Sequence, residues 1–309
     1  MTPEAEVHLP ETVATIGVFD GVHVGHQALI RRVVERARDL GAMSACVTFS
    51  PHPEDVLRPD REIAHLAALE DRLALIKQMG VSEVMVVDFT PSLAQKSPEE
   101  FIELLQRRFR LRELWIGSDF ALGRGRSGTP GVLAALGRDR GFQVHQFPPV
   151  KVGGVVASST LIRLMLAEGR VEEAASLLGR PYRLRGEVVS GDRRGRVLGF
   201  PTANIALRER LCVPGDGVYA VFCPGRGVPA LAGVANVGMR PTFASHRRQV
   251  EIHLIDFQGD LYGQELVVDF LARLRGEQRF ASAESLVAQI RQDIQTAKDL
   301  LQLHTGQAR

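Results

Sequence analysis

The sequence has few cysteines and no long hydrophobic segment, and each shortage narrows the class of protein. The three cysteines, Cys46, Cys212 and Cys223, are odd in number and lack the spacing of a metal site. They fit reduced thiols, so we expect a cytoplasmic protein. The longest nearly apolar stretch, residues 228–238, contains glycine and proline and is far shorter than the roughly 18 residues that span a bilayer. The acidic N-terminus lacks the basic and apolar segments of a secretory signal, so we expect neither a membrane protein nor a secreted one.

An excess of charge of one sign is also missing, because 38 basic residues face 36 acidic ones. A nucleic-acid partner usually requires a clustered basic stripe, so we expect none. Only four of the basic residues are lysine, but the arginines run through the whole chain, and this bias identifies no partner. What the sequence does have is length and apolar content, with 309 residues of which 45% are hydrophobic. These values are ordinary for a globular protein of two domains.

The first 150 residues alternate between two kinds of segment. Short runs rich in β-branched residues lie at 13–19, 43–49, 83–89, 113–117 and 142–147. Amphipathic segments lie between them, at 25–40, 66–79, 97–109 and 130–140. This alternation favours a parallel, doubly wound sheet with helices on both faces. Ligands of such folds bind beyond the carboxyl ends of the strands, next to helix N-termini.

The pattern changes near Pro181. Two helical segments, 159–167 and 171–178, precede it, and we expect one domain over residues 1–180 and a second over 181–309. Glycine-rich turns then separate short strands at 183–190, 218–222, 231–237, 250–257 and 264–271. Strands at this spacing predict an antiparallel barrel or sandwich, and the chain closes with an amphipathic helix over 282–303.

The segment GVFDGVHVGH, residues 17–26, follows the first predicted strand directly. His23 and His26 are three residues apart, so they can project side by side at the start of the next helix, whose free N–H groups attract phosphate. Gly25 between them lets a phosphate approach the backbone closely. Such donors suit an α-phosphate that gains charge as it is attacked. The alternatives are part of a metal site and a chance pair, and the strand-to-helix context favours phosphate.

Further candidate residues of the first half lie in polar or glycine-rich segments. The segment ASSTLIR, residues 157–163, can cap a helix and hold phosphate, although a plain serine cap is the simpler reading. GRGRSG, residues 123–128, matches the dinucleotide fingerprint, but it does not follow the first strand and lacks the later acid. Asp20 and Asp119 follow predicted strands and could contact a ligand or form turns. Phe49 could stack on a planar ring or fill the core.

The densest motif of the second half is GEVVSGDRRGRVLGFPTANI, residues 186–205. Its glycines allow a backbone that wraps phosphates, although a glycine-rich hairpin is the alternative. Thr202 and Asn204 are two apart, so on a strand they face the same way and offer hard ligands for Mg²⁺. Glu251 and His253 likewise share one face of a predicted strand. A carboxylate beside a Mg–nucleotide is a natural base for a substrate hydroxyl, and a solvated strand face is the alternative.

Together these motifs resemble one family over essentially the whole chain, the prokaryotic bifunctional riboflavin kinase/FAD synthetases. GVFDGVHVGH, TFSPHP, IGSDFALGRGRSG and ASSTLIR are similar to its adenylyltransferase module. GEVVSGDRRGRVLGFPTANI, GVANVGMRPTF, VEIHLIDF and DLYG are similar to its kinase module. The resemblance implies a nucleotidyltransferase, Rossmann-like N-terminal domain and a six-stranded antiparallel barrel. The barrel would phosphorylate riboflavin to FMN with ATP, and the N-terminal domain would adenylylate FMN to FAD with release of pyrophosphate.

The resemblance also assigns roles to residues. His23, His26 and Glu251 would be catalytic, and Mg²⁺ would accompany ATP. The adenylyltransferase would bind ATP through Gly17, Phe19, Gly25, Ser159, Thr160 and Arg163. The kinase would bind ATP through Gly191, Gly195, Gly199, Thr202 and Asn204, the last two also holding Mg²⁺. Flavin contacts would come from Phe49, Asp119, Arg275 and Phe280.

Two positions depart from the family pattern. Ser50 stands where an acid is common, and Leu161 stands where arginine is common. Both remove a polar contact, so the adenylyltransferase step could be weakened.

Three alternatives to this function stay open: one active module, most plausibly the kinase; a nicotinamide-dependent dehydrogenase built on GRGRSG; and a flavin-binding regulator without catalysis. We expect a monomer or weak homo-oligomer that acts on riboflavin, FMN and ATP, with no membrane partner.

Overall fold

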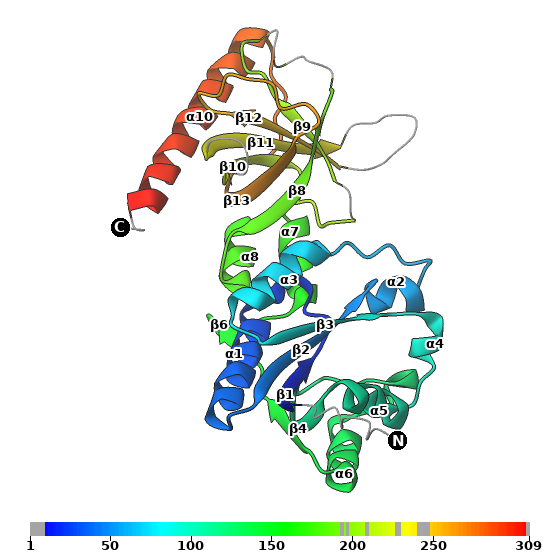
Figure 1. The fold of residues 1–309 in the computed structure, drawn as a ribbon. Helices are drawn as coiled ribbons and strands as arrows, with labels where there is room; N and C mark the ends of the chain where they lie inside the picture. The colour runs from blue at the N-terminus through cyan, green and yellow to red at the C-terminus, as the bar shows by residue number, and fades with distance from the viewer. Residues whose placement is uncertain are drawn as a thin grey trace, which may run out of the picture. The chain divides into compact units, whose positions relative to one another are not determined.

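The computed structural model describes residues 10–191, 195, 198–207, 210–225, 230–239 and 248–306, the last five by their backbone alone. Contacts divide the chain into two compact units (Figure 1). The first unit comprises the residues up to Ile63 together with Leu69–Ala157. The second comprises Ala64–Ala68 together with the residues from Ser158 onward.

The first unit contains a five-stranded parallel sheet in the order β3-β2-β1-β4-β5. Its strands are β1 (Glu11–Ile16), β2 (Met43–Ser50), β3 (Glu83–Asp88), β4 (Arg110–Gly117) and β5 (Gln143–Phe147). Its helices are α1 (Val24–Asp39), α2 (Pro53–Leu57), α3 (Leu69–Gln78), α4 (Pro91–Ala94), α5 (Pro98–Arg108) and α6 (Pro130–Arg140). A short hairpin, β6 (Lys151–Val152) and β7 (Val155–Val156), follows. The predicted doubly wound sheet is confirmed, and the strand order reverses between β1 and β4.

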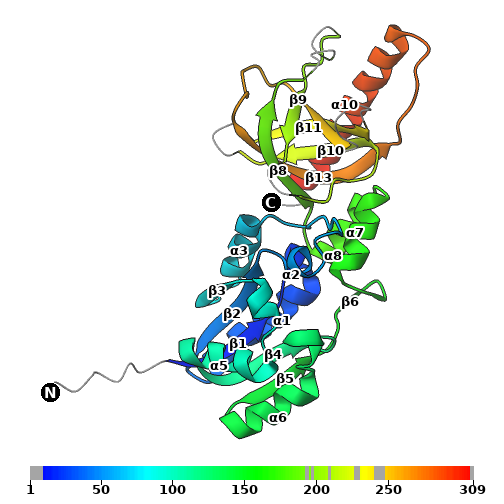
Figure 2. The same cartoon turned by 90° about the vertical axis from the view of Figure 1, so that its right-hand side faces the viewer.

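Both faces of this sheet are covered, because neighbouring residues on a strand point to opposite sides. In β1, Val13 packs with residues of α1 and α3 in one buried cluster. Ala14, the next residue, belongs to the other cluster, which contains residues of α5 and α6. Figure 2 shows the sheet between these layers. Helix α5 begins as predicted, with Ser97 and Glu100 forming a capping box before Pro98.

The second unit contains a closed barrel in the order β10-β11-β12-β9-β8-β13. Its strands are β8 (Tyr182–Val189), β9 (Ala203–Ala206), β10 (Gly217–Cys223), β11 (Leu231–Met239), β12 (Arg248–Leu254) and β13 (Glu265–Arg275). The six-stranded barrel is confirmed, and the sandwich alternative is wrong. Helix α10 (Ala283–Gly306) covers the outside of β10 and β11, where Ala297 packs with Val218 and Val234.

Two helices before the barrel, α7 (Ser159–Ala167) and α8 (Val171–Leu178), also belong to the second unit. Gly215 N donates to Leu166 O at 2.8 Å, and Arg273 N donates to a Glu172 carboxylate oxygen at 3.0 Å. These bonds attach the helix pair to the barrel. The division by contacts therefore falls between Ala157 and Ser158, whereas the sequence pattern placed the domain boundary after residue 180.

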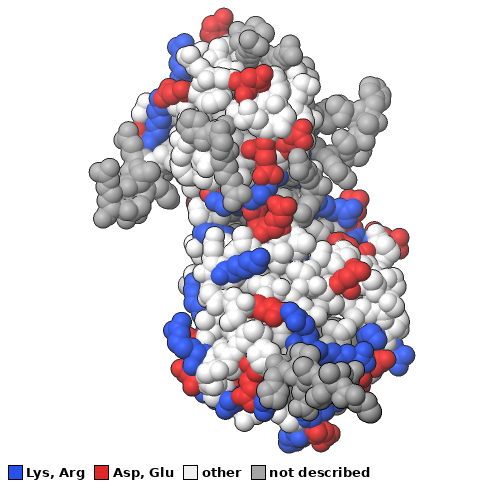
Figure 3. Space-filling view, in the orientation of Figure 1, with Lys and Arg blue, Asp and Glu red and all other residues white. Residues whose placement is uncertain are grey.

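The surface carries mixed charge. On the face drawn in Figure 3, basic and acidic side chains of the described residues are interspersed. Within the described part of the chain, no helix combines the length and the apolar character that crossing a bilayer requires.

Candidate active sites

The turn between β1 and α1 has an unusual backbone. Phe19 and Val22 adopt left-handed conformations, with φ values of 52° and 43°, around a short 3-10 turn at Asp20–Val22. Such conformations are rare for side chains of this size, above all for a β-branched valine. Both side chains are buried, and Val22 N donates to Phe19 O at 3.0 Å. The turn delivers the chain to His23, which caps α1 by accepting a 3.4 Å hydrogen bond from His26 N at Nδ1.

The two histidines of this turn lie side by side. Their ring centroids are 3.6 Å apart and their planes differ by 19°. The His26 ring also meets the edge of Phe19, with centroids 5.2 Å apart. The pKa of His26 lies well below its usual value because the ring is buried and a charge on His23 would repel its own. Its Nδ1 atom is buried and has no hydrogen-bond partner among the described residues.

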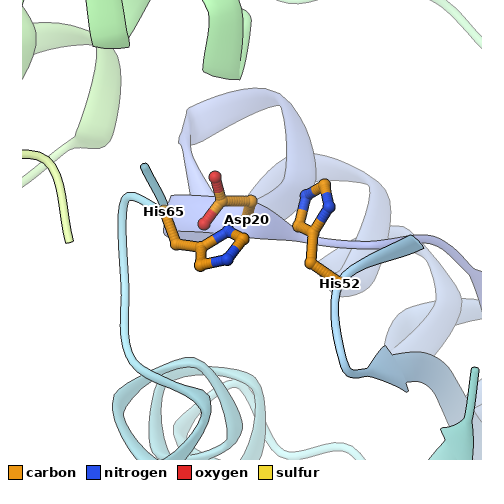
Figure 4. A group of neighbouring side chains, drawn as sticks. All are labelled: Asp20, His52 and His65. Atoms are coloured by element: carbon orange, nitrogen blue, oxygen red, sulfur yellow. The ribbon is translucent and has the colours of Figure 1, made fainter. Parts of the chain in front are cut away.

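Asp20 and His52 come together beside this turn, as Figure 4 shows. Asp20 follows β1 and is 3% exposed, and a ligand atom of His52 lies within 4.8 Å of its carboxylate. His52 caps α2, with Nδ1 accepting from Glu54 N at 3.1 Å. His65, also drawn there, lies on the short segment that belongs to the second unit. Asp20 was expected from its place after the first strand, whereas no sequence pattern gave His52 a role; Pro51 and Pro53 on either side of it are the signal of a fixed loop.

Two predicted flavin contacts of the first unit have different surroundings. Phe49 is 7% exposed and packs in the core against Phe89 and Phe101, with ring centroids 5.5 and 6.1 Å away. This favours the alternative of a core phenylalanine. Asp119 is exposed beyond β4, and its carbonyl accepts from Arg126 Nη2 at 2.9 Å.

The GRGRSG segment lies between β4 and α6 and forms a 3-10 turn at Arg124–Arg126. Arg124 N donates to Lys96 O at 2.8 Å, which ties the loop to the start of α5. A dinucleotide fingerprint lies instead between the first strand and the first helix of a βαβ unit. The loop is therefore a basic loop at the carboxyl end of β4, on the same edge of the sheet as the β1–α1 turn.

The ASSTLIR segment starts α7. Ser158 is its cap and accepts from Leu161 N at 3.3 Å, so Ser159 and Thr160 lie in the first turn. Arg163 Nε donates to Ala64 O at 2.9 Å. The first turn of a helix offers free N–H groups and the positive end of its dipole, which is the chemistry that holds phosphate.

In the barrel, the glycine-rich segment before β9 lies tightly against polar groups. A Cβ on Gly191 would overlap the amide of Asn204, and one on Gly195 would overlap the carbonyl of Phe200. Gly199 has a φ of 87°. The three glycines are thus required by space or by backbone conformation. Residues 192–194, 196 and 197 of this motif, and most of GMRPTF at 238–243, lie outside the described residues.

Glu251 lies at the centre of a polar row on the outside of the barrel. Its partners in register are Asn204 of β9 and Asn236 of β11, and side chains directly opposite one another point to the same face. The alternate residues of β12, Val250, Ile252 and Leu254, are buried inside. Glu251 and Asn204 were each predicted from the sequence. Asn236 was not, because only the strand pairing brings it beside them.

His253, on the same face as Glu251, holds the segment before β9. Its Nδ1 lies 2.9 Å from Pro201 O, and since a carbonyl only accepts, Nδ1 is the donor. The His253 ring also meets the edge of Phe200, with centroids 5.7 Å apart. These contacts fix the residues directly before Thr202.

Arg275 and Phe280, the other predicted flavin contacts, lie at the end of β13 and in the segment after it. Arg275 forms a largely buried ion pair with Asp293 of α10, Nη2 to Oδ2 at 2.9 Å and Nε to the same oxygen at 3.1 Å. Its guanidinium also lies over the Phe280 ring, 5.6 Å from the centroid. Asp293 was not predicted from the sequence, because an acid on an amphipathic helix ordinarily faces solvent.

The donors around Asn204 fit the magnesium that ATP chemistry implies. A hydroxyl of Thr202, an amide oxygen of Asn204 and the Glu251 carboxylate are hard oxygen ligands. The close approach of Gly191 to Asn204 forms a narrow cradle that a Cβ would fill. Among the described residues of the barrel, Thr202 and Asn204 are the ones that could hold the ion, and Glu251 lies opposite Asn204.

The first unit is a doubly wound sheet with two imidazoles at a helix N-terminus. The second is a barrel with a carboxylate among oxygen donors. Together in one chain they define a two-domain enzyme that transfers phosphate groups. The comparisons with known proteins specify it further. The model of the FAD synthetase family matches residues 5–161, and that of the riboflavin kinase family matches residues 178–301.

Relatives match over nearly the whole chain. The bifunctional riboflavin kinase/FMN adenylyltransferase of Escherichia coli (strain K12) is 41% identical over 292 residues, covering 94% of this chain and 93% of the relative. Proteins of the same description from Pseudomonas fluorescens and Bacillus subtilis (strain 168) are 42% and 36% identical, covering 93% of this chain and 92% of each relative. A crystal structure from Streptococcus pneumoniae, described as a macrolide-efflux protein, is 31% identical with a TM-score of 0.85, over 95% of this chain and 96% of that one.

The chain belongs to the bifunctional riboflavin kinase/FMN adenylyltransferase family. It is a transferase with an N-terminal FAD synthetase domain and a C-terminal riboflavin kinase domain. The predicted activities are confirmed: riboflavin is phosphorylated to FMN, and FMN is adenylylated to FAD, with ATP as the co-substrate. The dehydrogenase, single-module and regulator alternatives are set aside.

Proposed function

We propose that His23 and His26 are the catalytic residues of the adenylyltransferase reaction. A phosphate oxygen of FMN attacks the α-phosphorus of ATP, and pyrophosphate leaves. Charge grows on the oxygens of the α-phosphate during this step, and N–H donors that are already in place stabilise it. The observation that supports the proposal is the stacked pair at the start of α1, 3.6 Å between ring centroids.

We propose that the backbone of Gly17 and Gly25 and the ring of Phe19 shape the ATP site around this pair. A Cβ on Gly25 would lie 3.1 Å from the His23 ring, so a side chain there would crowd the pair. The same hypothetical atom would lie 3.9 Å from the Ala157 carbonyl, and Ser158 follows Ala157 in the chain. This chain connection supports the further proposal that Ser159, Thr160 and Arg163 bind the triphosphate.

In the kinase domain we propose that Glu251 is the base. The ribityl hydroxyl of riboflavin gives its proton to the carboxylate while its oxygen attacks the γ-phosphorus of ATP, and ADP leaves. The supporting observation is the register that sets Glu251 opposite Asn204. Gly191, Gly195 and Gly199 would let the loop approach the phosphates, and Thr202 and Asn204 would hold Mg²⁺. The ion, when bound, neutralises phosphate charge.

Flavin contacts are proposed for two residues, Asp119 in the first domain and Phe280 in the second. The Phe49 side chain packs in the core, and the Arg275 side chain is paired with Asp293. We therefore propose that Phe49 and Arg275 support the flavin sites through their neighbours. The assignment of residues 1–180 to one domain and 181–309 to the other is likewise proposed, with α7 serving the N-terminal reaction.

The enzyme is also proposed to work in the cytoplasm as a monomer or weak homo-oligomer, on small molecules and without nucleic-acid or membrane partners. The three cysteines are free and buried, which supports a reducing compartment. Light scattering behind a sizing column, with and without ATP and flavin, measures the oligomeric state directly.

The residue assignments are tested by a time course with riboflavin, ATP and Mg²⁺, in which flavins are separated by chromatography. His23→Gln and His26→Gln should stop the conversion of FMN to FAD while FMN still accumulates. His145→Gln, a change of a histidine elsewhere in the first domain, is the control. Full FAD synthesis in both folded variants would refute the histidine assignment. Calorimetry of Mg²⁺ and ATP binding to Asn204→Ala tests the metal assignment without relying on turnover.

A further inference from the structure

Arg72 of α3 is a buried arginine whose guanidinium contacts the backbone of two strands. The residue as a whole is 5% exposed. Nη1 donates to Val18 O at 2.9 Å, directly after β1, and Nη2 donates to Phe49 O at 2.7 Å, near the end of β2. Thr48 Oγ1 also donates to Val18 O, at 3.1 Å. One side chain therefore connects the carboxyl ends of two neighbouring strands.

The position of this guanidinium follows from the end of the strand ladder. The pairing of β1 with β2 continues to Gly17, whose N–H donates to Val47 O at 3.0 Å. Beyond it the two chains separate into loops. There Arg72 donates to the carbonyls of half-buried Val18 and buried Phe49, since carbonyls turned away from water need donors. The planar fork of arginine supplies two N–H groups in a fixed geometry, which the single ammonium of lysine does not.

The loop that Arg72 holds on the β1 side needs outside support. Phe19 and Val22 have φ values of 52° and 43°, and strained backbone of this kind persists only where its surroundings fix it. Gln27 Nε2 fixes one end by donating to Val22 O at 2.9 Å. Arg72 fixes the other end at Val18. The turn at Asp20–Val22 lies between the anchored residues Val18 and Val22 and leads directly into His23 at the start of α1.

We propose that Arg72 is a positioning residue for adenylyl transfer. By holding the carbonyls of Val18 and Phe49, it sets the β1–α1 turn, and with it the two histidines, relative to the loop after β2. This inference rests on the proposed catalytic roles of His23 and His26. Arg72 acts through the backbone, so its loss misplaces the histidines, and a displacement of about 1 Å can lower a rate about 100-fold.

The test uses the full-length chain with Arg72→Ala and Arg72→Lys, and Lys77→Met as a control that removes an exposed cation from the same helix. For Arg72→Ala we expect kcat of FMN adenylylation to fall about 100-fold while the KM values for ATP and FMN change far less. Riboflavin kinase activity of the same preparation should stay normal, and the fluorescence of Trp115 reports the folding of the first domain. Methylguanidinium added to Arg72→Ala should restore part of the lost kcat, and Arg72→Lys should stay impaired.

Several outcomes would overturn the inference. These are an unchanged kcat in folded Arg72→Ala and Arg72→Lys, a rise in KM alone, or an equal loss of kinase activity. If Arg72→Ala does not fold, Arg72→Lys decides by the same split between kcat and KM. Parallel assays of His23→Gln and His26→Gln separate the two proposals. If those variants stay active, the histidine assignment fails, whereas their inactivity beside an active Arg72→Lys overturns only the role of Arg72.

Discussion

The imidazole rings of His23 and His26 are stacked, with centroids 3.6 Å apart and planes at 19°. Two positive charges at this distance repel one another strongly, and burial of His26 disfavours its charge further. The pair therefore carries at most one positive charge near neutral pH. This relationship gives the first domain a pH dependence of its own.

The stability of the first domain should fall as the pH drops below about 6.5. The pKa of His26 in the folded chain is below the ordinary value of 6.5, so the unfolded chain binds more protons between those two values. Stability in this window rises with pH and is lost on acidification. Urea unfolding followed by the fluorescence of Trp115, the only tryptophan, should show a shallower pH slope in His26→Gln than in the wild type. Identical slopes would contradict the prediction.

Glu251→Gln should separate the two activities. The amide cannot accept the proton of the ribityl hydroxyl, so FMN formation should fall by a factor of about 100 to 10,000. FAD formation from supplied FMN should continue at the wild-type rate. Glu265→Gln, a change of an exposed carboxylate at the start of β13, is the matched control and should leave both rates unchanged. Loss of both activities in folded Glu251→Gln would contradict the assignment of separate sites.

Gly191→Ala should impair the kinase alone. The new Cβ would overlap the Asn204 amide, which must move away from Glu251 and from the proposed metal site. We expect a drop in FMN formation and weaker Mg–ATP binding by calorimetry, with FAD synthesis from FMN unaffected. Gly276→Ala is the control, because the nearest atom to its Cβ is 3.9 Å away. Normal Mg–ATP affinity in Gly191→Ala would argue against the cradle.

Asp293→Ala should destabilise the barrel by about 3 kcal/mol, because breaking a buried ion pair strands one charge. Arg275 and Asp293 have side chains that are 14% and 5% exposed. Urea unfolding followed by circular dichroism measures the change. Lys298→Met on the same helix breaks the exposed pair with Asp256 and should cost less than about 1 kcal/mol. Equal losses of unfolding free energy in the two variants would show that the buried Arg275–Asp293 pair stabilises the barrel no more than the exposed pair does.

Restoring the two unusual positions should raise FAD synthesis. Ser50→Asp adds an acid at the end of β2, and Leu161→Arg adds a cation in the first turn of α7. One charge-assisted hydrogen bond contributes about 1.5 kcal/mol, so each change should raise kcat/KM of adenylylation about ten-fold. Steady-state kinetics with FMN and ATP provide the measurement. Unchanged kinetics in both variants would mean that these departures are silent.

Much of the fold could be predicted because its signals are local. The alternation of runs and amphipathic segments identified β1 to β5 and the long helices, and Ser97 with Pro98 marked the start of α5. The short helices α2 and α4 and the β6–β7 hairpin were not predicted, since segments of two to five residues are too short to show a hydrophobic periodicity. The choice of barrel over sandwich needed strand pairing, which no local pattern contains.

The chemical groups of both sites are already visible along the chain: two histidines three apart after a strand, a serine cap, glycines before Thr202 and Asn204, and a carboxylate on an alternating strand. These features depend on neighbours along the chain, and short-range geometry preserves them. Which distant groups come into contact depends on the folding of the whole chain. Strand register set Glu251 between Asn204 and Asn236, and packing brought Arg72 to Val18 and Phe49, and Asp293 to Arg275. Such pairings depend on how whole elements stack, because burial of the entire apolar surface, and not the local sequence, selects them.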